Sequence, residues 1–221
     1  NSVSRVVPVD KLRKPIVKNI LTPGKRNQAD RLILDYEVLA EVVRGLKDHS
    51  YRIVLTQGVY DITHNGHWRY IEAAKEEGDI LIVGCDSDEL TRQRKQLPGG
   101  PKRPFDPFEE RAETLLHTRY VDIVTRRHTD QRLEELVEIV HPDVLILSET
   151  TEDIKDEHRA YLQQHCGKIK MLPAQAATSS TARLRSLMLE GASQLAEEIN
   201  EVVQKHLGGL GATSEKKGQR P

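Results

Sequence analysis

The chain has few cysteines, few aromatic residues and almost no net charge. Only two of its 221 residues are cysteines, Cys85 and Cys166, which is too few for a disulfide scaffold or a thiolate zinc site. The 33 Lys and Arg residues are balanced by 34 Asp and Glu residues, so the formal net charge of -1 provides no general attraction to nucleic acid or to an anionic membrane. Any anion that the protein binds must be held by a local group of residues.

Long apolar runs are also missing. No stretch approaches the length of a membrane span, and residues 1–18 lack the apolar centre of a signal peptide. We therefore expect a cytoplasmic protein that binds neither nucleic acid nor a membrane. A chain of 221 residues is enough for one core of ordinary domain size. The sequence leaves open whether this unit is a monomer or a homodimer.

Apolar runs alternate with amphipathic segments through the middle of the chain. Five runs rich in Val, Ile and Leu are expected to be strands, at residues 53–56, 80–84, 121–125, 144–147 and 169–172. The segments between them are long enough for helices, as a parallel sheet with right-handed crossovers requires. We predict an α/β fold, a Rossmann-like doubly wound parallel sheet of about five strands. Its ligands should bind just after the carboxyl ends of the strands, at Thr56, Cys85, Thr125 and Leu147.

The sequence divides into three parts. Residues 1–37 contain several prolines and no sustained periodicity, and they are expected to form an N-terminal extension. Residues 38–190 should form the α/β domain, with an entry helix whose apolar spacing begins at Leu32 and ends at Leu46. Residues 191–221 should contain the end of a C-terminal helix, followed by a disordered tail.

The strongest local signal lies directly after the first predicted strand. Gly58 can let backbone N–H groups approach a ligand, and a helix that begins near Asn65 would direct its unpaired N–H groups to the same place. His64 and His67 can both aim ring N–H donors at one phosphate, while Gly66 leaves room for that phosphate. The segment therefore predicts an anion site. Two alternatives for the histidine pair are a zinc site, which needs a third protein ligand, and ordinary helix capping.

The pattern Gly-x-x-Asp-x-x-His-x-Gly-His resembles the signature of the cytidylyltransferase-like nucleotidyltransferase superfamily. Within it, the chain most resembles the adenylyltransferase domain of the bifunctional heptose-phosphate enzymes and, more distantly, glycerol-3-phosphate cytidylyltransferase. The similarity covers about residues 38–187. It includes, in order, residues 78–84, 103–113, 121–122, 142–145 and 179–181. Such ordered agreement is more specific than the short motif alone.

The resemblance implies an enzyme that transfers AMP or CMP from ATP or CTP to a phosphorylated small molecule, such as a sugar or polyol phosphate, with release of pyrophosphate. Mg²⁺ would enter with the nucleotide, and no metal would be held by the protein. The resemblance assigns catalysis to His64, His67 and Lys95. It implies contacts with the nucleotide and its phosphates for Gln57, Gly58, Val59, Tyr60, Gly66, Arg103, Arg111, Ser179, Ser180, Thr181 and Arg183. Asp61 would orient Mg²⁺ or substrate, or brace the histidine loop.

Two of these assignments have plain structural alternatives. Lys95, Arg103 and Arg111 lie in or near a Gly- and Pro-rich basic segment, which can close over a triphosphate or simply be a solvated surface loop. For Arg92 and Arg94, the sequence does not decide between contact with a triphosphate and a solvated position on the surface. The hydroxyls of residues 179–181 are either an ordinary helix N-cap or a second phosphate cradle, and their combination with the histidine motif favours the cradle.

Two departures from the relatives bear on the substrate. Residues 148–151 read Ser-Glu-Thr-Thr where the heptose enzymes have a glycine-containing turn, and residues 173–177 lack the arginine of the glycerol-phosphate enzymes. The missing arginine favours ATP over CTP. The same chemistry in the synthesis of FAD, pantetheine or nicotinamide cofactors stays open, as does a nucleotide-binding regulator without turnover.

Overall fold

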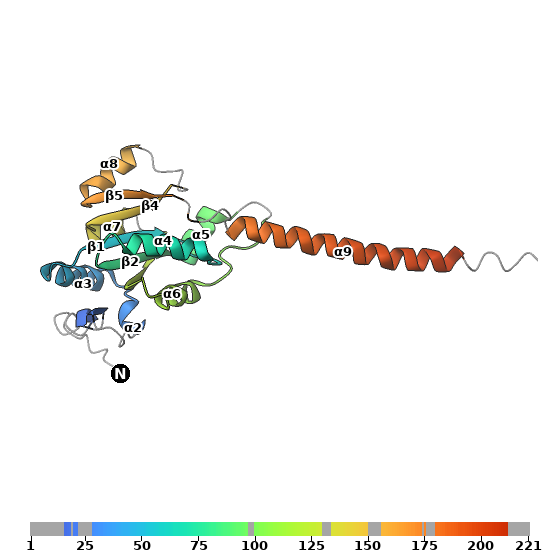
Figure 1. The fold of residues 1–221 in the computed structure, drawn as a ribbon, viewed down its shortest axis with the longest axis horizontal. Coiled ribbons are helices and arrows are strands. Elements are labelled where there is room, and N and C mark those ends of the chain that lie inside the picture. The colour runs from blue at the N-terminus through green and yellow to red at the C-terminus, as the bar shows by residue number, and fades with distance from the viewer. Residues whose placement is uncertain are drawn as a thin grey trace, which may run out of the picture. The chain divides into compact units, whose positions relative to one another are not determined.

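The computed structural model describes residues 16–18, 20–21, 28–96, 100–129, 134–149, 156–173, 175 and 180–211. The chain packs as two units, Asn1–Ala176 and Ala177–Pro221 (Figure 1). The first unit contains the sheet, and the second contains a single described helix. The boundaries predicted at residues 37 and 190 stay predictions.

The sheet has five parallel strands in the order β3-β2-β1-β4-β5. The strands are β1 (Ile53–Gly58), β2 (Ile80–Asp86), β3 (Ile123–Arg127), β4 (Val144–Ser148) and β5 (Lys168–Leu172). The predicted fold class is confirmed, and each predicted strand is present within two residues of its expected start. Long Val-, Ile- and Leu-rich runs form these strands because both faces of the sheet are covered.

Helices cover the two faces of the sheet. Among the described residues, the helices of the first unit with defined bounds are, in chain order, α2 (Gln28–Arg31), α3 (Tyr36–Asp48), α4 (Asn65–Lys75), α5 (Asp88–Lys95), α6 (Phe108–Leu116), α7 (Glu135–Val140) and α8 (Asp156–Gln164). Residues of α3, α7 and α8 pack in one core, and residues of α4 and α6 pack in the other. The strand order runs outward from β1 to β3 on one side and from β4 to β5 on the other, because the connections pass over opposite faces of the sheet. The strand order therefore reverses between β1 and β4.

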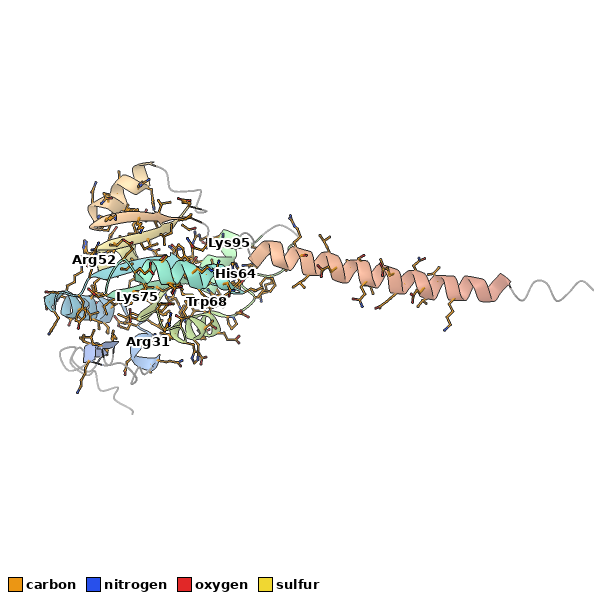
Figure 2. All side chains as sticks on the ribbon, viewed as in Figure 1. Arg31, Arg52, His64, Trp68, Lys75 and Lys95 are labelled. Atoms are coloured by element: carbon orange, nitrogen blue, oxygen red, sulfur yellow. The ribbon has the colours of Figure 1, made fainter. Side chains whose placement is uncertain are left out.

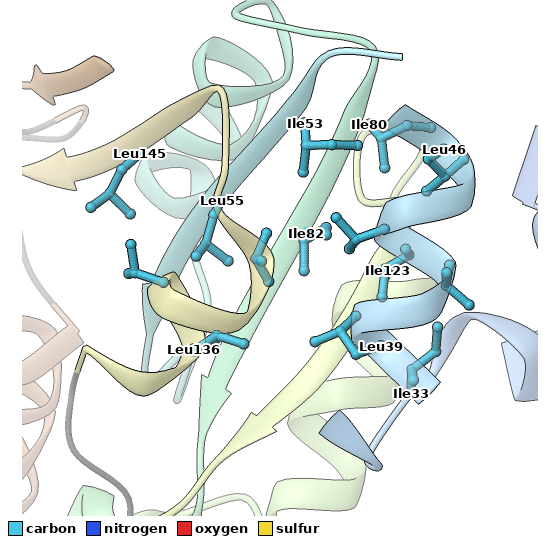
Figure 3. Close-up of a cluster of buried hydrophobic side chains, with 14 of the residues drawn as sticks. Ile33, Leu39, Leu46, Ile53, Leu55, Ile80, Ile82, Ile123, Leu136 and Leu145 are labelled. Atoms are coloured by element: carbon cyan, nitrogen blue, oxygen red, sulfur yellow. The ribbon is translucent and has the colours of Figure 1, made fainter. Parts of the chain in front are cut away.

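Alternate residues of each strand enter opposite cores. Leu55 and Ile82 face the core that contains Leu39 of α3 and Leu136 of α7 (Figure 3). Their sequence neighbours, including Val54, face the other core, against α4 and α6. This period of two is the geometry of an extended strand. It leaves only the ends of the strands open to ligands.

The entry helix begins later than predicted. The segment before Asp35 is extended: Leu32 forms an isolated parallel bridge to Val124 of β3, and the N–H of Ile33 donates to the Val124 carbonyl at 2.9 Å. Asp35 then caps α3, because its carboxylate accepts hydrogen bonds from two backbone N–H groups of the first turn. The helix predicted from Leu32 was therefore wrong at its start, since those apolar residues pair with the edge of the sheet.

The described part of the predicted N-terminal extension belongs to the packing of the first unit. Arg31 is buried, and its guanidinium donates to three backbone carbonyls, those of Leu116 (2.9 Å), Val121 and Asp122 (3.0 Å). Ile20 also lies in the hydrophobic core. Arg31 thus connects the end of α6 to the start of β3.

The second unit contains α9 (Ser180–Gly211). The helix is continuous at Gly191, and a Cβ there would meet nothing within 4 Å. One glycine in a helix costs about 1 kcal/mol relative to alanine, which weakens a helix without ending it. Among the residues that the structure describes, no helix combines the length and the apolarity that a membrane crossing needs.

Candidate active site

The two histidines of the motif cap helix α4. His64 is the N-cap residue, and its ring Nδ1 accepts a hydrogen bond from the backbone N–H of Gly66 at 3.1 Å. The Nδ1 of His67 accepts from the backbone N–H of His64 at 3.2 Å, which completes a reciprocal capping box. The capping alternative is therefore correct for one nitrogen of each ring. It does not compete with phosphate binding, because each ring has a second nitrogen.

These contacts determine which nitrogen carries the proton. A neutral imidazole whose Nδ1 accepts a hydrogen bond must carry its hydrogen on Nε2. Both rings therefore have their N–H donor at Nε2. The ring centroids of His64 and His67 are 4.3 Å apart, with 52° between the ring planes. The loop thus brings two ring donors together at the N-terminus of α4, where the helix dipole favours an anion.

The charge of His67 differs from that of an ordinary surface histidine. Burial of the ring, followed by repulsion from His64, lowers the pKa of His67 from 6.5 to about 4. His67 is therefore neutral at pH 7. In this state the ring carries no positive charge and can donate a hydrogen bond through Nε2.

We predict that ¹⁵N NMR of the protein without ligand will show His67 neutral with Nε2 protonated at pH 6, and titrating near pH 4. Between pH 6.5 and about 4 the unfolded chain would bind a proton at His67 that the folded protein does not. The free energy of unfolding should therefore decrease as the pH falls through this window. A titration of His67 near pH 6.5, or a proton on Nδ1, would contradict the geometry.

The loop between β1 and α4 has an unfavourable backbone conformation. Tyr60 has φ of 54° and Ile62 has φ of 48°, in a region that non-glycine residues rarely adopt and β-branched residues avoid. Gly58 makes room for this turn, since a Cβ there would stand 3.1 Å from the ring of Tyr60. Such a conformation persists only where neighbouring residues hold it.

Asp61 is one residue that holds the loop. Its carboxylate is buried and accepts hydrogen bonds from the backbone N–H groups of Phe105 (3.0 Å) and Asp106 (3.1 Å). The Nε of Arg103 lies 2.9 Å from the same carboxylate. Of the three roles predicted for Asp61, this geometry supports bracing. Among the described residues, no three His, Cys, Asp or Glu side chains are grouped to hold a metal ion.

Arg111 holds the loop from the other side. Its side chain is 1% exposed and donates to the carbonyls of Asp106 (2.9 Å) and Val59 (2.6 Å) and to the carboxylate of Asp88 (2.7 Å). Arg103 is similarly engaged by Asp61, and its guanidinium lies 5.0 Å from the ring centroid of Phe105. This geometry favours positioning roles for both arginines over the phosphate contacts predicted from the sequence, which stay untested.

Lys95 lies on the predicted edge of the sheet. It is the exposed last residue of α5. In Figure 2, Lys95 and His64 are at the end of the sheet toward which β1 runs, and Arg52 is at the opposite end. This location agrees with a role near the triphosphate.

The structure separates the two arginines that the sequence could not assign. Arg92 pairs with Glu89 on the surface of α5 at 2.7 Å. Arg94 instead reaches Asp86 at the end of β2, and its Nη1 lies 2.8 Å from the carboxylate. Arg94 therefore lies at the carboxyl edge of the sheet, where the sequence predicts ligand binding.

Sequence reasoning missed a polar cluster at this edge. The buried Asp86, the last residue of β2, contacts Arg94 through one oxygen and Arg127 of β3 through the other, the latter at 2.8 Å. Arg127 also donates to the side-chain oxygen of Gln57, a predicted phosphate ligand at the end of β1. The sequence feature that could have revealed this cluster is the position of Asp86 and Arg127, which are charged residues at the ends of apolar strands.

Several predicted residues cannot be placed against this loop. Ser179 lies outside the described residues, as do Thr150 and Thr151. Ser180 begins α9, but its side chain and those of Thr181 and Arg183 lie outside the described part. The second phosphate cradle therefore stays a prediction.

The two cysteines are free thiols, Cys85 buried and Cys166 partly buried. Cys85 is fully buried behind the histidine loop, and burial raises the pKa of its thiol to about 12. A protonated, buried thiol is a poor nucleophile. Cys85 therefore packs in the core beneath the site without a chemical role in it.

The sequence is similar to proteins of known families. The family model described as cytidylyltransferase-like matches residues 55–187. Bifunctional protein HldE from a Nitratiruptor species is 37% identical over 122 residues, which are 55% of this chain and 25% of that protein. HldE from Helicobacter pylori is 38% identical over 120 residues, 54% of this chain and 24% of that protein. The chain thus spans about a quarter of the length of these curated relatives.

Among solved structures, the lipopolysaccharide core biosynthesis protein from Thermoplasma volcanium is similar at a TM-score of 0.46 and 23% sequence identity, over 56% of this chain and 96% of that one. The family match has the greater weight. It includes the histidine loop and all but the first two residues of the sheet, and it extends over more than half of the chain. The resemblance inferred from the motif is confirmed, and the chain belongs to the cytidylyltransferase-like family of nucleotidyltransferase enzymes.

Proposed function

We propose that the protein transfers AMP, in preference to CMP, from a nucleoside triphosphate to the phosphate group of a small sugar or polyol phosphate. An oxygen of the acceptor phosphate attacks the α-phosphorus, the bond to the pyrophosphate oxygen breaks, and pyrophosphate leaves. The observation that carries the proposal is the pair of rings of His64 and His67 at the N-terminus of α4, in which each Nδ1 accepts a backbone hydrogen bond and Nε2 is the donor. The HldE relatives and the resemblance to heptose-phosphate enzymes support a sugar phosphate acceptor.

The proposed reaction needs no general base. The acceptor phosphate is already ionised, so catalysis consists of positioning the two phosphates and stabilising charge on the pentacoordinate phosphorus. His67, with its pKa lowered to about 4 by burial and by His64, stays neutral and donates without giving up its proton. Lys95 would neutralise charge on the departing pyrophosphate.

Mg²⁺ fits this site as a companion of the nucleotide. Asp61, the carboxylate nearest to the histidines in sequence, is engaged by two backbone N–H groups and by Arg103, which leaves it poorly suited to bind a metal. We therefore propose that triphosphate oxygens and water hold the ion. Bound there, Mg²⁺ would neutralise charge on the triphosphate.

A screen of acceptors tests the proposed reaction. Pyrophosphate release would be measured with ATP and with CTP, each in the presence of Mg²⁺ and one acceptor, with reactions that lack an acceptor as the control. We expect release with ATP and a sugar or polyol phosphate. Release only with FMN, phosphopantetheine or nicotinamide mononucleotide would support cofactor synthesis instead. Nucleotide binding without release from any acceptor would support a regulator.

Nucleotide binding should also stabilise the fold. A ligand that binds only the folded protein, at about a hundred times its dissociation constant, contributes roughly 2.7 kcal/mol. We predict that ATP with Mg²⁺ raises the melting temperature in scanning fluorimetry and that adenosine, which has no phosphate for His64 and His67 to bind, raises it less. A melting temperature unchanged by every nucleoside triphosphate would contradict the proposed function.

A further inference from the structure

Three strands each contribute one side chain to the polar cluster at the carboxyl edge of the sheet. Gln57 of β1 pairs in register with Gly84 of β2, and Asp86 of β2 pairs with Arg127 of β3. Residues two apart in a strand point to the same face, so these three side chains emerge on one face. A Cβ at Gly84 would stand 3.3 Å from Cγ of Gln57. The same Cβ would stand 2.6 Å from Cδ2 of Leu136, so the glycine leaves room for the side chains of Leu136 and Gln57 on this face.

The contact with Arg127 determines the orientation of the Gln57 amide. Arg127 donates a hydrogen bond to Oε1 of Gln57. A guanidinium has five N–H donors and no acceptor, so only the oxygen of the amide can face it. The amide N–H₂ group must then be directed away from Arg127. Gln57 is partly exposed and directly precedes Gly58, where the histidine loop begins.

Arg127 is itself held in place by a buried carboxylate. Its Nη2 lies 2.8 Å from Asp86, whose side chain is 0% exposed, while that of Arg127 is 7% exposed. Arg94 contacts the second oxygen of Asp86, also at 2.8 Å. Two guanidinium groups therefore share one carboxylate, and the cluster carries an excess positive charge beside a site for an anion. A buried ion pair of this kind has a defined orientation, because separating it would leave a charge uncompensated.

We propose that Arg127 is a positioning residue for nucleotidyl transfer: anchored by Asp86, it orients the Gln57 amide so that the N–H₂ group donates to phosphate oxygens of the bound nucleoside triphosphate. The inference rests on the proposed function for the identity of the ligand. It adds a residue of β3 that acts through Gln57 without touching the ligand. Without Arg127, the amide can turn its carbonyl oxygen toward the phosphates, which repels them.

A double-mutant cycle tests the inference. The affinity for ATP with Mg²⁺ would be measured by calorimetry, and kcat and KM by pyrophosphate release, for Gln57→Ala, Arg127→Met and the double variant. Each single change should weaken ATP binding about tenfold, the effect of losing one hydrogen bond to a charged group. The double variant should be no weaker than Gln57→Ala, because Arg127 acts through Gln57.

Two further variants distinguish this effect from a general loss of structure. Gln57→Glu keeps an oxygen facing Arg127, removes the N–H₂ donors and adds a negative charge without changing a buried residue, so it should lose at least as much affinity as Gln57→Ala. Arg126→Met is the matched control. Arg126 neighbours Arg127 on β3, points to the opposite face and pairs with Glu109 at 2.9 Å, so its loss should leave ATP affinity unchanged.

The possible results separate the two proposals. Additive effects of the single variants, wild-type affinity of Arg127→Met, or wild-type affinity of Gln57→Glu would each overturn the positioning role alone. Failure of the wild-type protein to bind either ATP or CTP would overturn the proposed function together with this inference.

Discussion

Alanine at His64 or at His67 should lower the turnover of nucleotidyl transfer by about 10²-fold or more. Each change removes an Nε2–H donor that is directed by the capping box at the N-terminus of α4. Such a donor acts where negative charge is rearranged during transfer, and loss of a single preorganised donor commonly has an effect of this size. The measurement is kcat from pyrophosphate release, with the acceptor identified by the screen. Because the lost interaction strengthens in the transition state, kcat should fall more than the affinity for ATP.

The fold should survive these substitutions. Each ring also caps α4 through Nδ1, so alanine should cost about 0.5–2 kcal/mol of stability, as the loss of other N-caps does. His64→Asn serves as the matched control, because asparagine is a good N-cap and its amide can donate to a phosphate. It should retain more stability and more turnover than His64→Ala.

Three results would contradict this assignment of the histidines. One is transfer at the wild-type rate by both alanine variants. The others are stoichiometric zinc in the purified protein and unfolding of the wild-type protein by a chelator, since loss of a structural metal ligand removes folding energy directly.

Alanine at Lys95 should lower kcat by about 10² to 10³-fold, with a smaller effect on the KM of the acceptor. Lys95 is exposed at the end of α5, on the edge of the sheet that also carries the histidine loop (Figure 2). A cation there would stabilise the charge that develops on the leaving pyrophosphate, a contribution that is greatest in the transition state. The melting temperature should change little, because the side chain is not part of either core.

Arg92→Ala is the control for Lys95→Ala. Arg92 belongs to the same helix, but it pairs with Glu89 on the surface. Exposed pairs of this kind contribute little to stability, so turnover and melting temperature should both stay near wild type. Equal turnover of Lys95→Ala and the wild-type protein would contradict the role of Lys95 and would support the alternative that the basic segment is a solvated surface loop.

Features that depend on residues close together in the chain were predictable from the sequence. The five strands are continuous apolar runs, and their alternation with amphipathic segments is enough to predict a doubly wound parallel sheet. The histidine motif is equally local. His64 and His67 are three residues apart, at the N-cap and in the first turn of one helix, and the capping box between them brings their rings together.

Features that depend on distant residues were decided only by the tertiary structure. The carboxylate of Asp61 accepts a hydrogen bond from the backbone of Phe105, 44 positions away, and Gln57 accepts one from Arg127, 70 positions away. Neither pairing leaves a periodic pattern in the sequence. Arg111 shows the same limit, since a basic residue near a phosphate site has the same sequence signature whether it faces the ligand or is buried against carbonyl groups. Only the packing of the strands and loops against one another determines which partner each charged side chain meets.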